Sequence, residues 1–355
     1  MSTGTPREHG FRMPAEWEPH EATWLAWPHN RNDWPGKFPA IQWVYADIVR
    51  YLQRHELVRL IVADTASEKK VRGLLVRAGV EDFSRIEFHC FPTDRSWVRD
   101  TGPLFITNSA EVAATSWRFS AWAKYPNWRR DDRVADKVAR RLGTKPWQPT
   151  HNGRRVVLEG GAIDVNGLGT LLTTEECLLS SDTQQRNPGM TRYDYEMVFR
   201  EYLGVPNVLW LGNGIVGDDT HGHVDDLARF VGPRTIVTVL ETDPADPNFE
   251  PLQDNLRRLR QARDQDGRPF KIVELPMPRP VMFGGCRLPA SYANFYISNG
   301  LVLVPTFNDP NDRVALGVLA DLFPGRDVIG IHSVDFAWGF GTIHCSTQQQ
   351  PASAV

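Results

Sequence analysis

The sequence predicts an α/β protein built from about five similar units of roughly 60 residues, in which strand, strand, helix and strand recur in that order. Turn residues of hairpin type repeatedly precede a stretch of helical periodicity and a short apolar strand. A single such unit cannot bury its own sheet face, so the units must cover one another. A closed ring and one open α/β sheet both satisfy this requirement. No linker or low-complexity stretch interrupts the 355 residues, which predicts a single domain, 1–355.

The elements follow from local signals. A hairpin at Asn166 to Gly169 joins strands 164–165 and 170–174, helix 193–203 ends before Gly204 and Pro206, and strand 207–211 completes that unit. The remaining predicted strands are 22–27, 57–63, 104–107, 111–117, 223–231, 235–240, 271–275, 291–297, 301–305 and 327–331, and the remaining helices lie at 41–52, 131–142, 249–263 and 312–322. The tail after Cys345 is expected to be frayed.

Composition excludes several classes of protein. The formal net charge is −3, with no long run of one sign, which argues against nucleic acid as a partner. No apolar run approaches the ~18 residues of a membrane span, and the N-terminus does not resemble a signal peptide. The 4 cysteines form no C-x-x-C pair, so a zinc ribbon or a disulfide scaffold is not expected. These features predict a cytoplasmic protein.

Five polar segments next to glycines recur at the same phase of the units. Their marker residues are spaced by 59, 64, 69 and 53 positions, which would bring all of them to one end of a ring. They supply carboxylates, one histidine and one cysteine. The sequence contains no phosphate loop or nucleotide fingerprint. The markers are Asp100, Glu159, His223, Tyr292 and Cys345.

Cys345 lies between a glycine-containing loop and a polar run, whereas Cys177 has apolar neighbours typical of a packed cysteine. Cys345 is therefore a candidate nucleophile, although an inert small residue is also compatible with the pattern. A reactive thiolate needs a partner. His344 would point away from it on a strand, so the more distant His223 is the candidate.

Asp225 would share a strand face with His223, and together they would provide acid/base chemistry. The spacing His221-x-His223-x-Asp225 also matches one kind of metal site, but Asp226 stands where such a site needs another histidine. Asp100 and Glu159 could instead have a structural role only, by forming a turn hydrogen bond or by pairing with an arginine. Carboxylates that converge on a cysteine raise its pKa, and a planar guanidinium substrate would supply the missing positive charge.

These segments resemble the agmatine deiminase and bacterial peptidylarginine deiminase family of the guanidino-modifying (pentein) superfamily. The matching motifs, from end to end, are M-P-A-E-W-E-P-H at 13–20, W-V-R-D-T-G-P at 97–103, L-E-G-G at 158–161, T-E-E-C-L-L at 174–179, N-P-G-M at 187–190, G-H-V-D at 222–225, R-L-P-A-S-Y-A-N-F-Y-I at 287–297 and I-H-C-S-T-Q-Q-Q-P-A at 343–352. The resemblance implies a five-bladed ββαβ propeller with pseudo-five-fold symmetry and a central active-site channel.

The resemblance also implies the chemistry. Cys345 would be the nucleophile, His223 the acid/base, Asp100 and Asp225 the guanidinium clamps, and Glu159 the active-site glutamate. A covalent thiouronium on the cysteine would form with loss of ammonia, and water would then release a ureido product, without metal or cofactor. Agmatine would give N-carbamoylputrescine, on a route to putrescine. A homodimer is a family-level expectation.

The sequence departs from the family pattern around the far end of the pocket, at Phe340, Thr342 and His221 and in a longer stretch at 93–96. Trp97 is expected to line the pocket. Other tryptophans, such as Trp122, are expected to have no role beyond packing. Asp218 and Asp219 would attract a primary ammonium, or form a solvated acidic loop. Several alternatives to agmatine remain open. They are another guanidino compound, a peptidyl C-terminal arginine met by Arg95 or Arg287, an amidinotransferase reaction and a non-catalytic propeller.

Overall fold

Three sheets share one strand order in the computed structural model, which describes residues 4–353. In each, the central strand pairs antiparallel with the strand before it and parallel with the strand after the helix. This order confirms the predicted succession of strand, strand, helix and strand. The sheets contain β8 (Asp164–Val165), β9 (Thr170–Thr174) and β10 (Asn207–Leu211); β11 (Ala228–Gly232), β12 (Thr235–Leu240) and β13 (Lys271–Pro276); and β16 (Tyr296–Ser298), β17 (Leu301–Thr306) and β18 (Asp327–His332).

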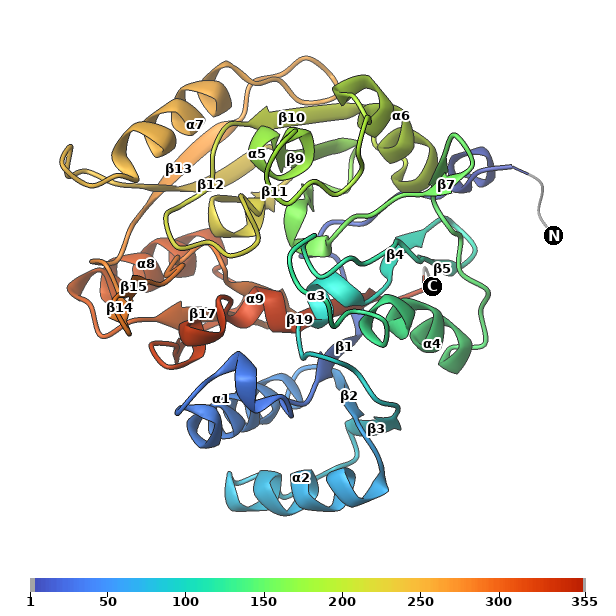
Figure 1. Cartoon of the computed structure of the whole chain (residues 1–355), viewed down its shortest axis with the longest axis vertical. Helices are drawn as coiled ribbons and strands as arrows, with labels where there is room; N and C mark the ends of the chain where they lie inside the picture. Colours follow the sequence, from blue (N-terminus) through green and yellow to red (C-terminus); the bar gives the residue numbers. More distant parts are fainter. Residues whose placement is uncertain (1–3, 354–355) are drawn as a thin grey trace.

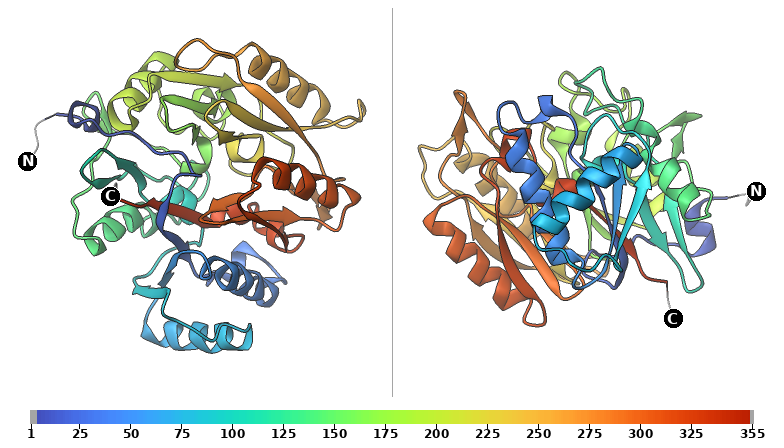
Figure 2. Two further views of the ribbon diagram at one scale, coloured as in Figure 1. Left: turned by 180° about the vertical axis from the view of Figure 1, so that it is seen from behind. Right: turned by 90° about the horizontal axis from the view of Figure 1, so that it is seen from below.

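A fourth sheet joins the two ends of the described chain. Its order is β19 (Thr347–Pro351), β1 (His20–Ala26), β2 (Leu57–Val62) and β3 (Ile86–Cys90), with β1 antiparallel to β19 and parallel to β2. Figure 2 shows the first and last strands side by side in the middle of the molecule.

The expected fraying after Cys345 is therefore wrong for the described residues, because every residue of β19 is buried. Its run of glutamines did not suggest a buried strand. The side chains find partners inside the protein, however, and the Trp24 indole donates to Gln350 Oε1 at 3.0 Å. Residues 354–355 of the tail lie outside the described part of the chain.

The fifth unit is reduced. Its hairpin of β4 (Leu104–Thr107) and β5 (Val112–Thr115) has the expected antiparallel pairing, but the third strand is a single parallel bridge between Thr115 and Trp147. Two small hairpins lie outside the repeated sheets. They are β6 (Thr150–His151) with β7 (Arg154–Arg155), and β14 (Met282–Phe283) with β15 (Cys286–Arg287).

The sheets follow one another around the centre of the molecule, and the longer helices lie farther out (Figure 1). Those helices are α1 (Phe38–Leu52), α2 (Thr65–Arg77), α4 (Val134–Arg141), α6 (Arg192–Leu203), α7 (Phe249–Gln261) and α8 (Pro310–Leu322). Their apolar residues recur at helical spacing and pack on the sheets; in α7 these are Leu252, Leu256 and Leu259. Each fully buried leucine contributes about 1.5–3 kcal/mol to folding.

Four short helical turns lie near the centre, in contact with one another. The turn α3 (Val98–Thr101) contacts α9 (Ile343–Ser346) and the 3-10 turn η4 (Gly160–Ala162), and η4 contacts the 3-10 turn η5 (Val224–Asp226). Each turn comes from a different polar segment of the sequence. None of the helices in residues 4–353 has the length and apolar character that crossing a bilayer requires.

Two predicted strands near the centre are much shorter in the structure, and a third central segment is helical. The strand expected at 223–231 begins only at Ala228, because His223 precedes the η5 turn. The strand expected at 291–297 begins at Tyr296, and His344 lies in α9 rather than on a strand. At His223, the preceding residues His221 and Gly222 both have positive φ, which turns the chain out of extended geometry.

Candidate active site

The four central turns bring together four of the five marker residues, Asp100, Glu159, His223 and Cys345. The fifth, Tyr292, lies elsewhere, and its hydroxyl donates to Asp312 at 2.7 Å. Its near neighbour Asn294 reaches the centre instead. A cavity of about 520 Å³ opens onto Asp100 and Cys345.

Cys345 is buried beside carboxylates. Its Sγ lies 3.6 Å from Asp225 Oδ2, and Asn294 Nδ2 donates to the sulfur at 3.2 Å. Burial raises the pKa of the Cys345 thiol well above its usual range, and the charges of Asp225, Asp226 and Asp100 raise it further. The free site therefore favours a thiol over a thiolate.

Only one of the two carboxylate oxygens of Asp225 has a hydrogen-bond partner in the described part of the chain. His344 Nδ1 lies 2.7 Å from its Oδ2, whereas Oδ1 is buried and has no hydrogen-bond partner within residues 4–353. Burial alone would raise the pKa of Asp225, but the hydrogen bond and charge of His344 and the charge of His223 hold it below its ordinary value. The free oxygen is thus an ionised acceptor at the centre of the site.

Asp100 accepts from two fixed donors. The Trp122 indole donates to Oδ2 at 2.8 Å, and the Gly161 amide donates to Oδ1 at 3.0 Å. Burial, followed by the charges of Asp225 and Glu159, raises the pKa of Asp100 to about 6 even though His223 and Trp122 oppose the shift. Trp122, which was expected only to pack, therefore contacts a site carboxylate.

His223 lies among three carboxylates. Its Nδ1 is 4.0 Å from both Asp100 Oδ1 and Asp225 Oδ1, and its Nε2 is 3.8 Å from Glu159 Oε2. Burial would lower the pKa of His223, but the nearby carboxylates, Asp100 first, raise it well above its usual value. The strand predicted to align His223 with Asp225 is absent, and the η5 turn brings the two residues together instead.

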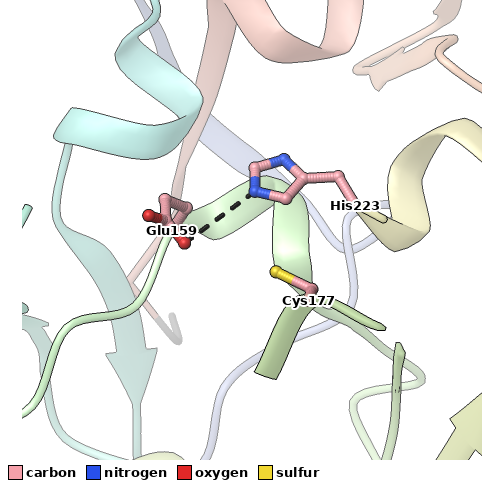
Figure 3. A group of neighbouring side chains, drawn as sticks. All are labelled: Glu159, Cys177 and His223. Atoms are coloured by element: carbon pink, nitrogen blue, oxygen red, sulfur yellow. Dashed lines mark ion pairs between the residues drawn. The ribbon is translucent and has the colours of Figure 1, made fainter. Parts of the chain in front are cut away.

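Figure 3 shows Glu159 and the Cys177 thiol on neighbouring sides of the His223 ring. Arg186 Nε donates to Glu159 Oε1 at 3.1 Å. Burial opposes ionisation of Glu159, but the charges of Arg186 and His223 bring its pKa to about 2. Glu159 is thus a permanent anion behind the histidine.

The metal site suggested by His221, His223 and Asp225 does not form, because the His221 ring turns toward Glu176, 3.5 Å away. A different group, Glu159, Cys177 and His223, places one possible ligand atom from each residue within 4.8 Å of the others. The Arg186 guanidinium already neutralises the carboxylate of that group, so a metal ion there would meet a buried positive charge.

The outer part of the cavity has aromatic and charged walls. Trp97 lines it as expected, and Asp219 lines it, but Asp218 does not. Phe340, at a position where the family pattern has glycine, lines it with a left-handed φ of 62°. Arg287 pairs with Asp246 away from this cavity.

Sequence reasoning did not identify the buried partners of the site. Glu16 Oε2 lies 2.8 Å from His344 Nε2, and Arg99 and Arg229 pair with the same carboxylate. Glu16 and His344 are 328 positions apart, and no local pattern predicts that pairing. Their presence in the shared motifs 13–20 and 343–352 was the one available signal.

Comparison with known proteins shows similarity over the whole chain. A family model described as Porphyromonas-type peptidyl-arginine deiminase matches residues 12–351. The chain is 36% identical over 374 residues to an agmatine deiminase of Ectopseudomonas mendocina, covering 99% of this chain and 98% of the relative. It is 38% identical over 379 residues to that of Pseudomonas fluorescens, covering 99% of both.

Solved structures show the same similarity. The agmatine deiminase of Enterococcus faecalis superposes with a TM-score of 0.91 at 33% identity, over 100% of this chain and 99% of that one. An amidinotransferase from Microseira wollei superposes with a TM-score of 0.53 at 12% identity, over 96% and 98% of the two chains. The second match indicates a shared fold only.

Proposed function

Since the chain belongs to the Porphyromonas-type peptidyl-arginine deiminase family and is a homologue of the agmatine deiminases, we propose that it converts agmatine into N-carbamoylputrescine and ammonia through a covalent intermediate on Cys345. At the coarser level it is a guanidino-group deiminase, a hydrolase of C–N bonds in linear amidines. The substrate and the cysteine mechanism are the proposal.

The arrangement of Cys345 beside Asp225 and Asp100 is the observation that carries the proposal. A guanidinium is planar and presents paired N–H donors, which suits two carboxylates. Asp225 has a buried oxygen free to accept, and Asp100 lines the same cavity as the sulfur. A cation bound there would also offset the carboxylate charges that disfavour the thiolate.

The proposed first half-reaction begins when substrate enters and Cys345 loses its proton to solvent water, since His223 is already protonated. The sulfur attacks the central guanidinium carbon, and the electron pair of a C–N double bond moves onto nitrogen. His223, whose raised pKa makes it a proton donor, protonates the departing nitrogen. The C–N bond breaks, ammonia leaves and a thiouronium remains on the sulfur.

The second half-reaction uses the same residues in reverse roles. His223, now neutral, takes a proton from water as the oxygen attacks the thiouronium carbon. The C–S bond then breaks as the C=O double bond forms, its electron pair and the hydroxyl proton go to the sulfur, and the ureido product leaves with the Cys345 thiol restored. Glu159, kept ionised by Arg186, would hold His223 in place for both steps.

We also infer that the five ββαβ units form a closed five-bladed propeller with pseudo-five-fold symmetry. Pairing of β1 with β19 supports closure, because it joins the first and last units in one sheet. The cavity above Cys345 would then be the central channel. A homodimer stays a family-level prediction that size-exclusion chromatography with light scattering would test.

A screen of candidate substrates, in which the release of ammonia and of the ureido product is measured, tests the function directly. Agmatine, arginine, 4-guanidinobutyrate and arginine-terminated peptides would be compared, and agmatine is expected to have the highest kcat/KM. Absence of turnover with agmatine, or equal rates with all substrates, would contradict the proposal. Transfer of the amidino group to an added amine would instead indicate an amidinotransferase.

A pair of cysteine variants tests the nucleophile. Cys345→Ala is expected to abolish ammonia release and to prevent trapping of a substrate-derived adduct in acid-quenched mass spectra. Cys90→Ala, which changes a half-buried thiol on the outer strand β3, is the matched control and should retain activity. An adduct that persists in Cys345→Ala would overturn the assignment.

The proposed mechanism uses no metal ion, so EDTA is expected to leave the rate unchanged.

A further inference from the structure

The outer part of the active-site cavity contains a buried carboxylate, Asp33, of which only one oxygen accepts hydrogen bonds from the described residues. Asp33 lines the cavity, and its side chain is 2% exposed. Its Oδ1 accepts from Arg95 Nη1 at 2.7 Å and from Asn30 Nδ2 at 3.1 Å. Its Oδ2 has no hydrogen-bond partner within residues 4–353. A buried carboxylate oxygen without a donor is costly, so a bound donor would be stabilised there.

The two acidic residues expected to recognise a distal ammonium are already occupied. Asp218 accepts from the Thr220 amide and hydroxyl with one oxygen, and from the Gly222 and His223 amides with the other. Asp219 pairs with Lys124 through Oδ1 and accepts from the Tyr125 hydroxyl at 2.7 Å through Oδ2. Asp218 does not line the cavity, and each oxygen of Asp219 already has a partner, which makes both residues weaker candidates than Asp33.

Arg95, the cation next to Asp33, is also fully engaged on its outer nitrogens. Nη1 donates to Asp33, Nη2 donates to Asn127 at 3.2 Å, and the guanidinium lies 4.3 Å over the Tyr125 ring. Its remaining nitrogen, Nε, is buried and, like Asp33 Oδ2, has no hydrogen-bond partner within residues 4–353. Arg95 is the one cation among the described residues that line the cavity, and its charge is paired with Asp33, whereas Asp219 adds a second carboxylate to the outer wall. The charges that line the outer cavity therefore favour a cationic group over a carboxylate.

We propose that Asp33 binds the distal ammonium of the substrate, so that the enzyme selects guanidines with a second cationic group and no carboxylate. This inference rests on the proposed deiminase function. The guanidinium end would lie at Asp100, Asp225 and Cys345, while Asp33 Oδ2 accepts a charge-assisted hydrogen bond from the far end of the chain. The methylene groups between would pass along Trp97 and Phe340.

The test compares agmatine with n-butylguanidine, which has the same four-carbon chain without the amine. In Asp33→Asn, KM for agmatine is expected to rise about 10–100-fold, the effect of losing one hydrogen bond between charged groups. KM for n-butylguanidine should change less than about threefold, because that substrate never contacts Asp33. The kcat of both should stay close to that of the wild type.

Two acidic residues provide comparisons. Asp335 pairs with Lys37 at 2.8 Å and does not line the cavity, so Asp335→Asn should leave both substrates unaffected. Asp219→Asn should affect both guanidines alike, since its oxygens are taken. Equal losses for both guanidines in Asp33→Asn, or selective loss of agmatine in Asp219→Asn, would overturn the proposal.

A longer carboxylate gives a second readout in case Asp33→Asn does not fold. Asp33→Glu keeps the charge but moves it one methylene farther along the side chain. It is expected to shift the preference toward 3-aminopropylguanidine, one methylene shorter than agmatine, by at least about fivefold in kcat/KM. An unchanged chain-length preference would contradict the role of Asp33. If the wild type releases ammonia from neither agmatine nor n-butylguanidine, the deiminase function itself fails, and this inference with it.

Discussion

His344 connects the α9 turn, which contains Cys345, to Glu16, a carboxylate near the start of the described chain. Both ring nitrogens lie within 2.8 Å of carboxylate oxygens, Glu16 on one side and Asp225 on the other. The ring thereby bridges the two carboxylates, and, against the effect of burial, its hydrogen bond and charge lower the pKa of Asp225. This contact fixes Oδ2 of Asp225, whereas Oδ1 has no partner within residues 4–353. We therefore expect His344 to be a positioning residue that acts through Asp225.

His344→Gln should lower kcat/KM for agmatine by about 10–100-fold, because glutamine cannot supply a charged donor to Asp225. Steady-state kinetics would measure the loss, and thermal unfolding would show whether the variant is folded at the assay temperature. Asn294→Ala is a comparison that removes a donor to Cys345 and the acceptor of the His344 amide but keeps the His344 side chain itself. A folded His344→Gln enzyme with kcat/KM within threefold of the wild type would contradict the positioning role.

Asp100 should set the acid limb of the pH profile. Its pKa is raised to about 6, chiefly by burial, so Asp100 becomes protonated as the pH falls through that value and loses its charge toward the guanidinium. We expect kcat/KM to fall about tenfold per pH unit below pH 6. Trp122→Phe removes a hydrogen bond that favours the ionised form, so the limb should move to higher pH. A limb that stays in place in this variant would argue against Asp100 as its origin.

At the scale of elements, the sequence predicted the strand bounds correctly where turn residues next to a strand define its ends. β4, β9, β10 and β12 have the predicted bounds, since alternation and the glycine turns next to them specify the strands. It failed at η5, where His223-x-Asp225 reads as strand alternation. The turn arises because Asp218 binds the amides of Gly222 and His223 and thereby bends the segment. A side chain that caps its own loop leaves little trace in hydrophobic periodicity.

Asp218→Ala should therefore destabilise the fold and displace His223 together. It removes four hydrogen bonds to one loop, which we expect to cost about 2 kcal/mol or more of unfolding free energy. The kcat should fall more than KM changes, because the acid/base group loses its position while the clamps stay. Denaturant unfolding and steady-state kinetics would measure both. A large rise in KM with unchanged kcat would instead indicate direct substrate binding.

At the scale of the whole molecule, the pairing of β1 with β19 joins the two ends of the described chain in one sheet. His20 lies opposite Pro351, and Ala352 donates its amide to the Pro19 carbonyl at 2.8 Å. Local patterns could not predict this pairing, because it links the two ends of the described chain and because the glutamines of β19 read as solvent-exposed. The ring was one of two possibilities from periodicity, and the family resemblance favoured it.

Deletion of residues 347–355 should prevent folding, because it removes a buried strand and exposes the edge of β1. Circular dichroism and size-exclusion chromatography would detect an unfolded or aggregated product. A chain that ends at Ala352 keeps all of β19 and serves as the control. A folded, monodisperse deletion variant would show that β19 is dispensable for the fold.

The position of Cys345, two residues before β19, also has a kinetic consequence. Cys345 can reach Asp225 and Asn294 only when β19 is in place, and β19 depends on a contact between opposite ends of the described chain. Contacts of such long sequence separation form late in folding. During refolding from denaturant, helix and sheet signals should therefore recover first. The return of enzymatic activity would report the moment at which the ends of the chain meet.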